Sequence, residues 1–186
     1  MDAAIALIGR HGYAATTAQQ IGLQAGYSRD MVRVRFGSKE ALLDAMLSSR
    51  YEGRLDIPDE PGESGLDRVL RRIASLRDFA IDDPDLLRAM FVLNFEAAQA
   101  DTQLRTRIRH WIDHVRADLA AAIRAGQDDD SITGGLDADV ESLEMVSTII
   151  GFAYWWIVEP GFDLPGELDA WSTRVQTRLS VPFQNR

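Results

Sequence analysis

Apolar side chains recur every three or four residues along almost the whole chain, the spacing that places them on one face of an α-helix. Clusters of glycine, proline and aspartate interrupt this pattern and separate one helix from the next. No stretch shows the strict alternation typical of a β-strand. The pattern predicts an all-α protein, with helices over residues 1–11, from 16 or 17 to about 25, 29–35, from 39 onward, 66–82, 84–99, 102–125, 137–158 and 166–179.

One segment has the composition of a linker. Residues 56–65 contain two prolines, two glycines and four acidic residues, which favour turns over helix. We therefore predict an N-terminal domain over residues 1–55, a linker over 56–65 and a second helical domain over 66–186.

Composition narrows the class of protein. A chain of 186 residues is long enough to bury a sizeable core, and it contains no cysteine, which suits a reducing compartment. No apolar run approaches the roughly 18 residues that span a bilayer, and Asp2 stands where a signal peptide carries positive charge. We expect a soluble cytoplasmic protein with no membrane partner.

Charge is distributed unevenly along the chain. The formal net charge is -9, yet residues 1–54 contain seven Lys/Arg against five Asp/Glu, a local charge of +2. Three of these basic residues, Arg29, Arg33 and Arg35, fall within seven positions. A polyanion would meet this N-terminal segment rather than the acidic remainder.

The arginines lie in a helix-turn-helix pattern. Two short helices are joined by a turn at Gly26, a residue that adopts positive φ without a Cβ penalty, and Gly22 leaves room for the two helices to pack closely. Ser28 is the expected cap of the second helix, and Val32 and Phe36 are expected to face inward. The residues then left to face base edges and phosphates are Arg29, Asp30, Arg33 and Val34, with Lys39, Thr16 and Thr17 as further phosphate contacts.

The alternative explanation is a solvated helix face whose arginines only aid solubility. The order and spacing of several motifs argue against it. The chain has "GY" at 12–13, "TT" at 16–17, "IG" at 21–22, "AGYS" at 25–28, and "F" followed by "SKEALL" within 36–43. Residues 3–46 resemble the DNA-binding domain of tetracycline-repressor-type (TetR family) transcriptional regulators.

The resemblance implies a one-component transcriptional regulator, more often a repressor, that binds palindromic operator DNA as a homodimer. The chain departs from the family pattern where Asp30, Met31 and Arg33 replace the usual glycine, threonine and aromatic residue. Asp30 is unusual at such a surface, because phosphates repel its carboxylate. The carboxylate fits there if it accepts a hydrogen bond from a cytosine amine or pairs with an arginine. The full set of predicted DNA-binding residues is Thr16, Thr17, Ser28, Arg29, Asp30, Met31, Arg33, Val34 and Lys39.

The resemblance also implies that residues 66–186 bind a small molecule and dimerise. Apolar and aromatic side chains that suit a hydrophobic effector are abundant there, although core packing is the alternative for each of them. The candidate ligand-binding residues are Phe91, Asn94, Phe95, Gln99, Trp111, His114 and Phe152. Segments 137–158 and 166–179 correspond to the family's dimer helices, so the predicted interface residues are Trp155, Trp156, Ile157 and Trp171.

The stretch "HWIDH" at 110–114 is the one candidate for metal chemistry. His110 and His114 are four residues apart, a spacing that can hold a metal ion, but no third ligand is identifiable. The chain also shows no cysteine, phosphate-binding glycine loop or nucleophile–base pair. We therefore predict no metal, no cofactor and no enzymatic activity.

The sequence thus predicts a ligand-responsive regulator that a small hydrophobic effector releases from its operator. The remaining alternative is a regulator-like protein that has lost specific DNA binding, because of Asp30 and the absence of a basic arm before the first helix. Such a protein would serve as a ligand-binding or protein-interaction module.

Overall fold

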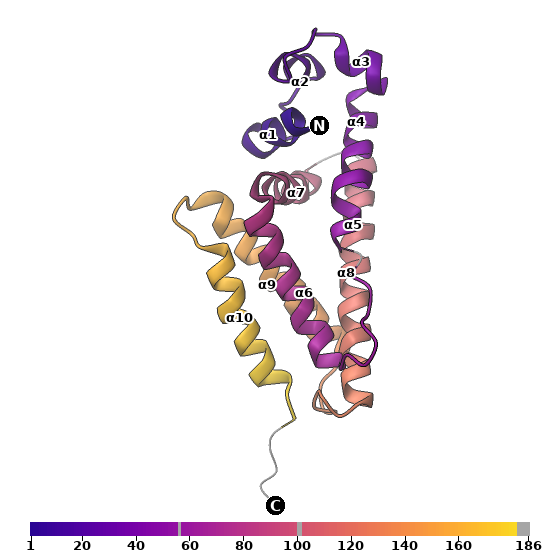
Figure 1. Cartoon of the computed structure of the whole chain (residues 1–186), viewed down its shortest axis with the longest axis vertical. Coiled ribbons are helices and arrows are strands. Elements are labelled where there is room, and N and C mark those ends of the chain that lie inside the picture. The colour runs from indigo at the N-terminus through magenta and orange to yellow at the C-terminus, as the bar shows by residue number, and fades with distance from the viewer. Residues whose placement is uncertain (56, 100–101, 182–186) are drawn as a thin grey trace, which may run out of the picture. The chain divides into compact units, whose positions relative to one another are not determined.

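The computed structural model describes residues 1–55, 57–99 and 102–181, and these ranges are almost entirely helical (Figure 1). The all-α prediction is confirmed: among the described residues no strand forms, apart from an isolated antiparallel bridge between Ile132 and Ser180. Within these ranges every helix is too short or too polar to cross a lipid bilayer. The elements are α1 (Asp2–His11), α2 (Ala18–Gln24), α3 (Met31–Phe36), α4 (Lys39–Met46), the π-helical turn η1 (Leu47–Tyr51), α5 (Glu52–Leu55), α6 (Gly65–Asp82), α7 (Pro84–Ala97), α8 (Thr102–Asp128), α9 (Ala138–Val158) and α10 (Leu164–Leu179).

The chain divides into two compact units. Unit 1 comprises Met1–Ile57 and Asp83–Ile108, and unit 2 comprises Pro58–Asp82 and Arg109–Arg186. Helix α7 therefore groups with the N-terminal helices, and α8 contributes residues to both units. The sequence did not indicate this grouping, and the domain boundaries at 56–65 stay a prediction.

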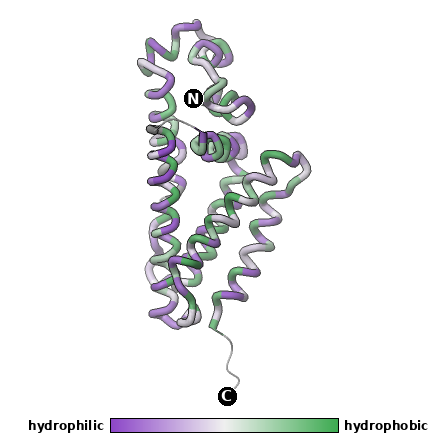
Figure 2. The backbone as a smooth tube through the Cα atoms, turned by 180° about the vertical axis from the view of Figure 1, so that it is seen from behind, coloured by the Kyte–Doolittle hydropathy of each residue, from purple (hydrophilic) through white to green (hydrophobic). Residues whose placement is uncertain are grey.

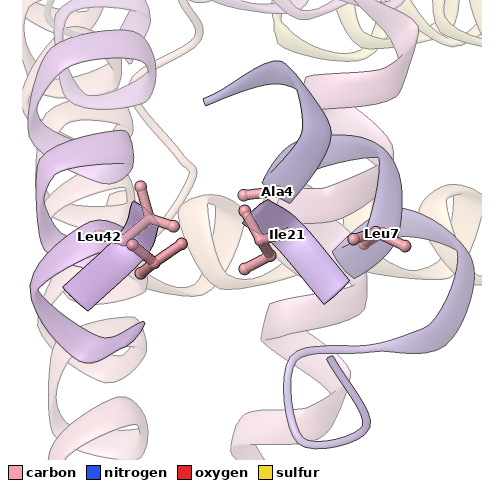
Figure 3. Packing of buried hydrophobic residues seen from close by; sticks show 5 residues of the cluster. Ala4, Leu7, Ile21 and Leu42 are labelled. Carbon is pink, nitrogen blue, oxygen red and sulfur yellow. The ribbon is translucent and has the colours of Figure 1, made fainter. Parts of the chain in front are cut away.

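The core of the first helices in unit 1 is small and apolar. Ala4 and Leu7 of α1 pack with Ile21 of α2 and Leu42 of α4, and the fully buried Val32 of α3 completes the cluster (Figure 3). The other face of α1 lies against α7. Burial of these few side chains fixes the short helices, because helices of six or seven residues are not stable alone in water.

Polar side chains set most helix starts. Ser38 accepts from the amide of Ala41 at 3.0 Å and begins α4, as the sequence predicted. Asp83, Asp137 and Asp163 cap α7, α9 and α10 in the same way. The prediction that Ser28 caps α3 is wrong: the helix begins at Met31, and its N-cap position is Asp30.

In unit 2, α6 and α10 form the main packing pair. Hydrophilic and hydrophobic residues alternate around the long helices, as expected when one side is buried (Figure 2). Arg77 of α6 pairs with Asp169 of α10 at 2.8 Å, and Arg178 joins α10 to Glu144 of α9 at 3.0 Å. These partly exposed ion pairs join α6 to α10 and α10 to α9.

Candidate nucleic-acid interface

The turn between α2 and α3 is built tightly. Thr17 and Gln20 form a reciprocal capping box at the start of α2: the Thr17 hydroxyl accepts from the Gln20 amide, and the Gln20 side chain accepts from the Thr17 amide. Gly26 adopts φ +75°, as the turn requires. A Cβ on Gly22 would lie 2.4 Å from the Ser28 carbonyl oxygen, so only glycine lets the turn fold back onto α2.

The turn leaves one side of α3 buried and the other exposed. Val32 is 0% exposed and anchors the helix, with Met31 and Phe36 partly buried beside it. Val34, by contrast, is 80% exposed. Arg29, Asp30 and Arg33 are exposed as well, as predicted, and so is Arg35.

This exposed surface is positively charged. It carries three arginines against one carboxylate, and the Arg33 Nε lies 3.7 Å from an Asp30 carboxylate oxygen. The Arg35 guanidinium lies 5.6 Å from the centre of the Phe36 ring. Guanidinium groups presented in this way are suited to phosphate oxygens and to guanine.

Two predicted phosphate contacts lie inside unit 1 instead. Thr16 is 1% exposed, and its hydroxyl donates to the Gly12 carbonyl at 2.6 Å, so the prediction that its side chain touches DNA is wrong. The Lys39 ammonium donates to the carbonyls of Tyr13 at 3.0 Å and Thr16 at 2.9 Å. It also lies 4.1 Å from the centre of the Tyr13 ring. Lys39 therefore holds the α1–α2 loop. The side chains of Thr16 and Lys39 both donate hydrogen bonds to backbone carbonyls that lie outside the helices.

Sequence reasoning missed Glu96 of α7. Its carboxylate accepts from the Tyr13 amide at 2.7 Å, on the other side of the same loop from Lys39. Gly12 has φ +82°, and a Cβ there would lie 2.1 Å from the Glu96 Oε1. The "GY" motif was visible in the sequence, but nothing marked Glu96 as its partner.

The Tyr13 side chain is part of this loop. Burial raises its pKa to about 12, and the nearby carboxylates of Glu40 and Asp44 act in the same direction. Its hydroxyl donates to Glu40 at 3.5 Å. The phenol is therefore neutral over the physiological range and acts only as a donor and a packing surface.

Two exposed apolar residues near the turn were also missed. Leu23 of α2 and Tyr27 of the turn are both more than half exposed. Leu23 lies off the apolar stripe that contains Ile21, which was a signal available in the sequence. Both lie within six residues of Arg29 in the chain.

The predicted ligand-binding residues fall into both units. Unit 1 contains four of them: Phe91, Asn94, Phe95 and Gln99. Phe91 is buried, Gln99 is exposed, and the Asn94 amide donates to the Met90 carbonyl of its own helix at 2.8 Å. Unit 2 contains the other three: the partly buried Trp111 and Phe152 and the exposed His114.

The predicted dimer residues separate into surface and core. Trp155 of α9 is 56% exposed, and Trp156 and Ile157 are partly buried. Trp171 is 7% exposed and meets the Phe152 ring edge-on at 6.0 Å. The prediction for Trp171 is wrong, because this side chain packs inside its own unit.

The histidine pair of α8 shows no metal-binding arrangement. His110, Asp113 and His114 are all exposed. In the ranges that the structure describes, no group of three or more His, Cys, Asp or Glu residues is placed to hold a metal ion.

Comparison with known proteins agrees with the helix-turn-helix geometry. A family model described as bacterial regulatory proteins of the tetR family matches residues 1–46. Over 163 residues the chain is 26% identical to the HTH-type transcriptional repressor SCO4008 of Streptomyces coelicolor, a match that covers 86% of this chain and 77% of the relative. Residues 1–46 therefore match the DNA-binding part of the tetR family, and most of the chain is similar to a repressor of the helix-turn-helix type.

Solved structures of TetR-type regulators share its fold. One from Rhodococcus RHA1 has a TM-score of 0.74 at 19% identity, with 96% of this chain and 94% of that one covered. The SmeT–triclosan complex has a TM-score of 0.74 at 22% identity, with 98% and 90% covered. SmeT is the repressor of the SmeDEF multidrug efflux pump of Stenotrophomonas maltophilia. These matches support a DNA-binding transcriptional regulator rather than an enzyme, as the sequence predicted.

Proposed function

We propose that this chain is a TetR-type repressor that binds palindromic operator DNA as a homodimer and that a small apolar effector releases it. It acts in the cytoplasm, where bacterial DNA lies. The observation that carries the DNA-binding part is the exposed side of α3. Three arginines lie at the end of a helix-turn-helix. Arg29 is in the turn before α3, and Arg33 and Arg35 are on α3, whose opposite side is anchored by the buried Val32. In this motif the second helix enters the major groove.

Salt-dependent DNA binding tests this assignment. Arg29→Ala combined with Arg33→Ala removes two charges from the proposed interface, so affinity for operator DNA falls and the slope of log K against log salt decreases by up to about two. Fluorescence anisotropy over a salt series, with a DNA fragment enriched from a random pool, measures both quantities. Arg109→Ala, which removes an exposed arginine of unit 2, is the matched control and leaves the slope unchanged. An unchanged slope in the double variant would show that α3 does not meet the phosphates.

The outer face of α9 supports the homodimer. Met145, Val146 and Ala153 of this helix are buried in unit 2. Other apolar side chains of α9 remain about half exposed: Val140, Leu143, Tyr154, Trp155 and Val158. Contiguous exposed apolar surface of this kind marks interfaces, and aromatic residues are enriched in their centres. A second copy of α9 is the occupant we propose, because two copies of α3 read twice as much of a palindromic site.

Light scattering tests the dimer. We expect the wild-type protein to have twice the chain mass at micromolar concentration. Tyr154→Glu combined with Trp155→Glu places two carboxylates in the proposed interface and should reduce the mass to that of one chain. Ile81→Glu changes an equally exposed apolar residue of α6 and should leave the dimer intact. A monomeric wild type, or a dimeric double variant, would contradict the proposal.

The structural similarity to the triclosan complex of SmeT supports an apolar effector. Phe91 and Phe95 on α7 remain predicted contacts for such a molecule. Triclosan is therefore the first probe: we expect it to raise the melting temperature of the wild type, because a ligand that binds the folded state stabilises it. Phe95→Ala should reduce that rise. A melting temperature that triclosan does not change would count against an effector of this chemistry, and equal rises in both proteins would remove Phe95 from the site.

A further inference from the structure

Asp30 stands at the N-cap of α3 without capping it. An aspartate at this position commonly accepts a hydrogen bond from an amide of the first helical turn. Here the backbone of Asp30 is already helical (φ −90°, ψ −1°), and its side chain makes no cap hydrogen bond. The helix start uses the backbone carbonyl, which accepts from the Val34 amide at 3.0 Å. The carboxylate therefore has no structural role in starting the helix.

The carboxylate is directed toward Arg33 on the exposed side. The Asp30 Oδ1 and the Arg33 Nε are 3.7 Å apart, and the two side chains are 70% and 75% exposed. Their positions, three residues apart, place both on one side of α3. A hydrogen-bond acceptor and a set of donors thus lie next to each other on the surface that the proposed function places in the major groove.

The chemistry of the groove determines which base suits a carboxylate. Phosphates offer no donor, and the donors that bases present in the major groove are the N4 amine of cytosine and the N6 amine of adenine. Adenine carries the N7 acceptor next to its amine, which repels the second carboxylate oxygen, whereas cytosine carries no acceptor beside N4. Cytosine is therefore the base that complements Asp30.

We propose that Asp30 reads a cytosine in each operator half-site, with Arg33 beside it on a neighbouring guanine. This inference rests on the proposed function, because it requires α3 to enter the major groove. The Arg33 Nε lies next to Asp30, so a guanine would be bound through the terminal amines of Arg33 at O6 and N7. The ion pair offsets the repulsion between Asp30 and the phosphates, so Asp30 contributes to specificity rather than to overall affinity.

Selection from a random DNA pool tests the proposal. The full chain, Asp30→Ala, Asp30→Asn and Asp85→Asn are each used to enrich duplex DNA. We expect the wild type to enrich cytosine at one position of each half-site. Asp30→Ala should lose the preference at that position and keep the preferences at all others. Asp30→Asn should shift it toward adenine, because an amide pairs with adenine N6 and N7. Asp85→Asn removes the same charge from an exposed position on α7 and should enrich the wild-type sequence.

Affinity measurements on defined sites give the magnitude. Replacing the enriched cytosine should weaken wild-type binding by about tenfold and Asp30→Ala binding by less than about twofold. If the wild type enriches a sequence and Asp30→Ala enriches the same one, base reading by Asp30 is wrong and the proposed function stands. The same conclusion follows if the cytosine preference is lost in Arg33→Ala but not in Asp30→Ala. If the wild type enriches no sequence, specific operator binding is itself wrong and this inference fails with it.

Discussion

The surface around α3 and the first residue of α4 both carry basic side chains predicted to meet phosphate, but the structure uses them differently. Arg29, in the turn before α3, and Arg33, on α3, are both exposed to solvent. Lys39 turns inward to two loop carbonyls. The difference follows from the backbone: a helix uses its own carbonyls, whereas the loop leaves acceptors that attract the nearest ammonium group. Affinity for DNA and stability of the fold should therefore respond to different substitutions.

The largest effect is expected in the loop, at Gly12. Gly12→Ala forces a non-glycine residue to φ +82° and places its Cβ 2.1 Å from the Glu96 carboxylate. We expect a loss of about 2–3 kcal/mol in the free energy of unfolding, measured by urea denaturation. Gly53→Ala is the control, because a Cβ there meets nothing within 4 Å. A Gly12→Ala protein as stable as wild type would show that the Glu96 contact does not constrain the loop.

Lys39→Ala comes next. It leaves two loop carbonyls without their charged donor, so the free energy of unfolding should fall by about 2 kcal/mol. The salt slope of DNA binding should stay the same, since the ammonium is bound within unit 1. If instead the slope fell by about one while stability was preserved, Lys39 would be a phosphate contact after all.

Arg29→Ala should give the opposite result. The side chain is exposed, so stability should change by no more than about 0.5 kcal/mol. The salt slope should fall by about one, because a phosphate contact is lost. Urea denaturation and anisotropy titrations on the same sample separate the two effects, and a purely structural loss in Arg29→Ala would remove the contrast between α3 and the loop.

The smallest effect concerns pH. The pKa of Tyr13 is raised to about 12 in the folded protein, from 10.0 in the ordinary phenol. Its contribution to stability is therefore complete below pH 10 and is lost as the pH rises through 12. Because the side chain is partly exposed, the loss should be under about 1 kcal/mol. Urea denaturation of the wild type and of Tyr13→Phe across this pH range measures the contribution of the Tyr13 phenol. Identical pH profiles for the two proteins would contradict the raised pKa.

Local chemistry explains why much of unit 1 could be predicted. Ser38 begins α4, Thr17 begins α2 and Gly26 makes the turn, because each depends only on neighbours in the chain. The burial of Val32 also followed from spacing alone. These features need no knowledge of distant residues.

The failures concern either the direction of a side chain or a partner far along the chain. Thr16 and Lys39 were assigned to DNA because a motif marks residue types but not the direction of a side chain. Glu96 lies 83 residues from Tyr13, and no spacing rule joins them. Trp171 was placed at the surface by analogy, whereas its packing against Phe152 depends on how α9 and α10 meet.

The grouping of α7 with the N-terminal helices has a practical consequence for dissecting the protein. A fragment that ends within residues 56–65 would contain the whole helix-turn-helix but would lack the helix against which α1 packs. Such a peptide would expose the side of α1 around Gly9 and leave the Tyr13 amide without its carboxylate acceptor. A fragment of residues 1–55 on its own should therefore not bind DNA.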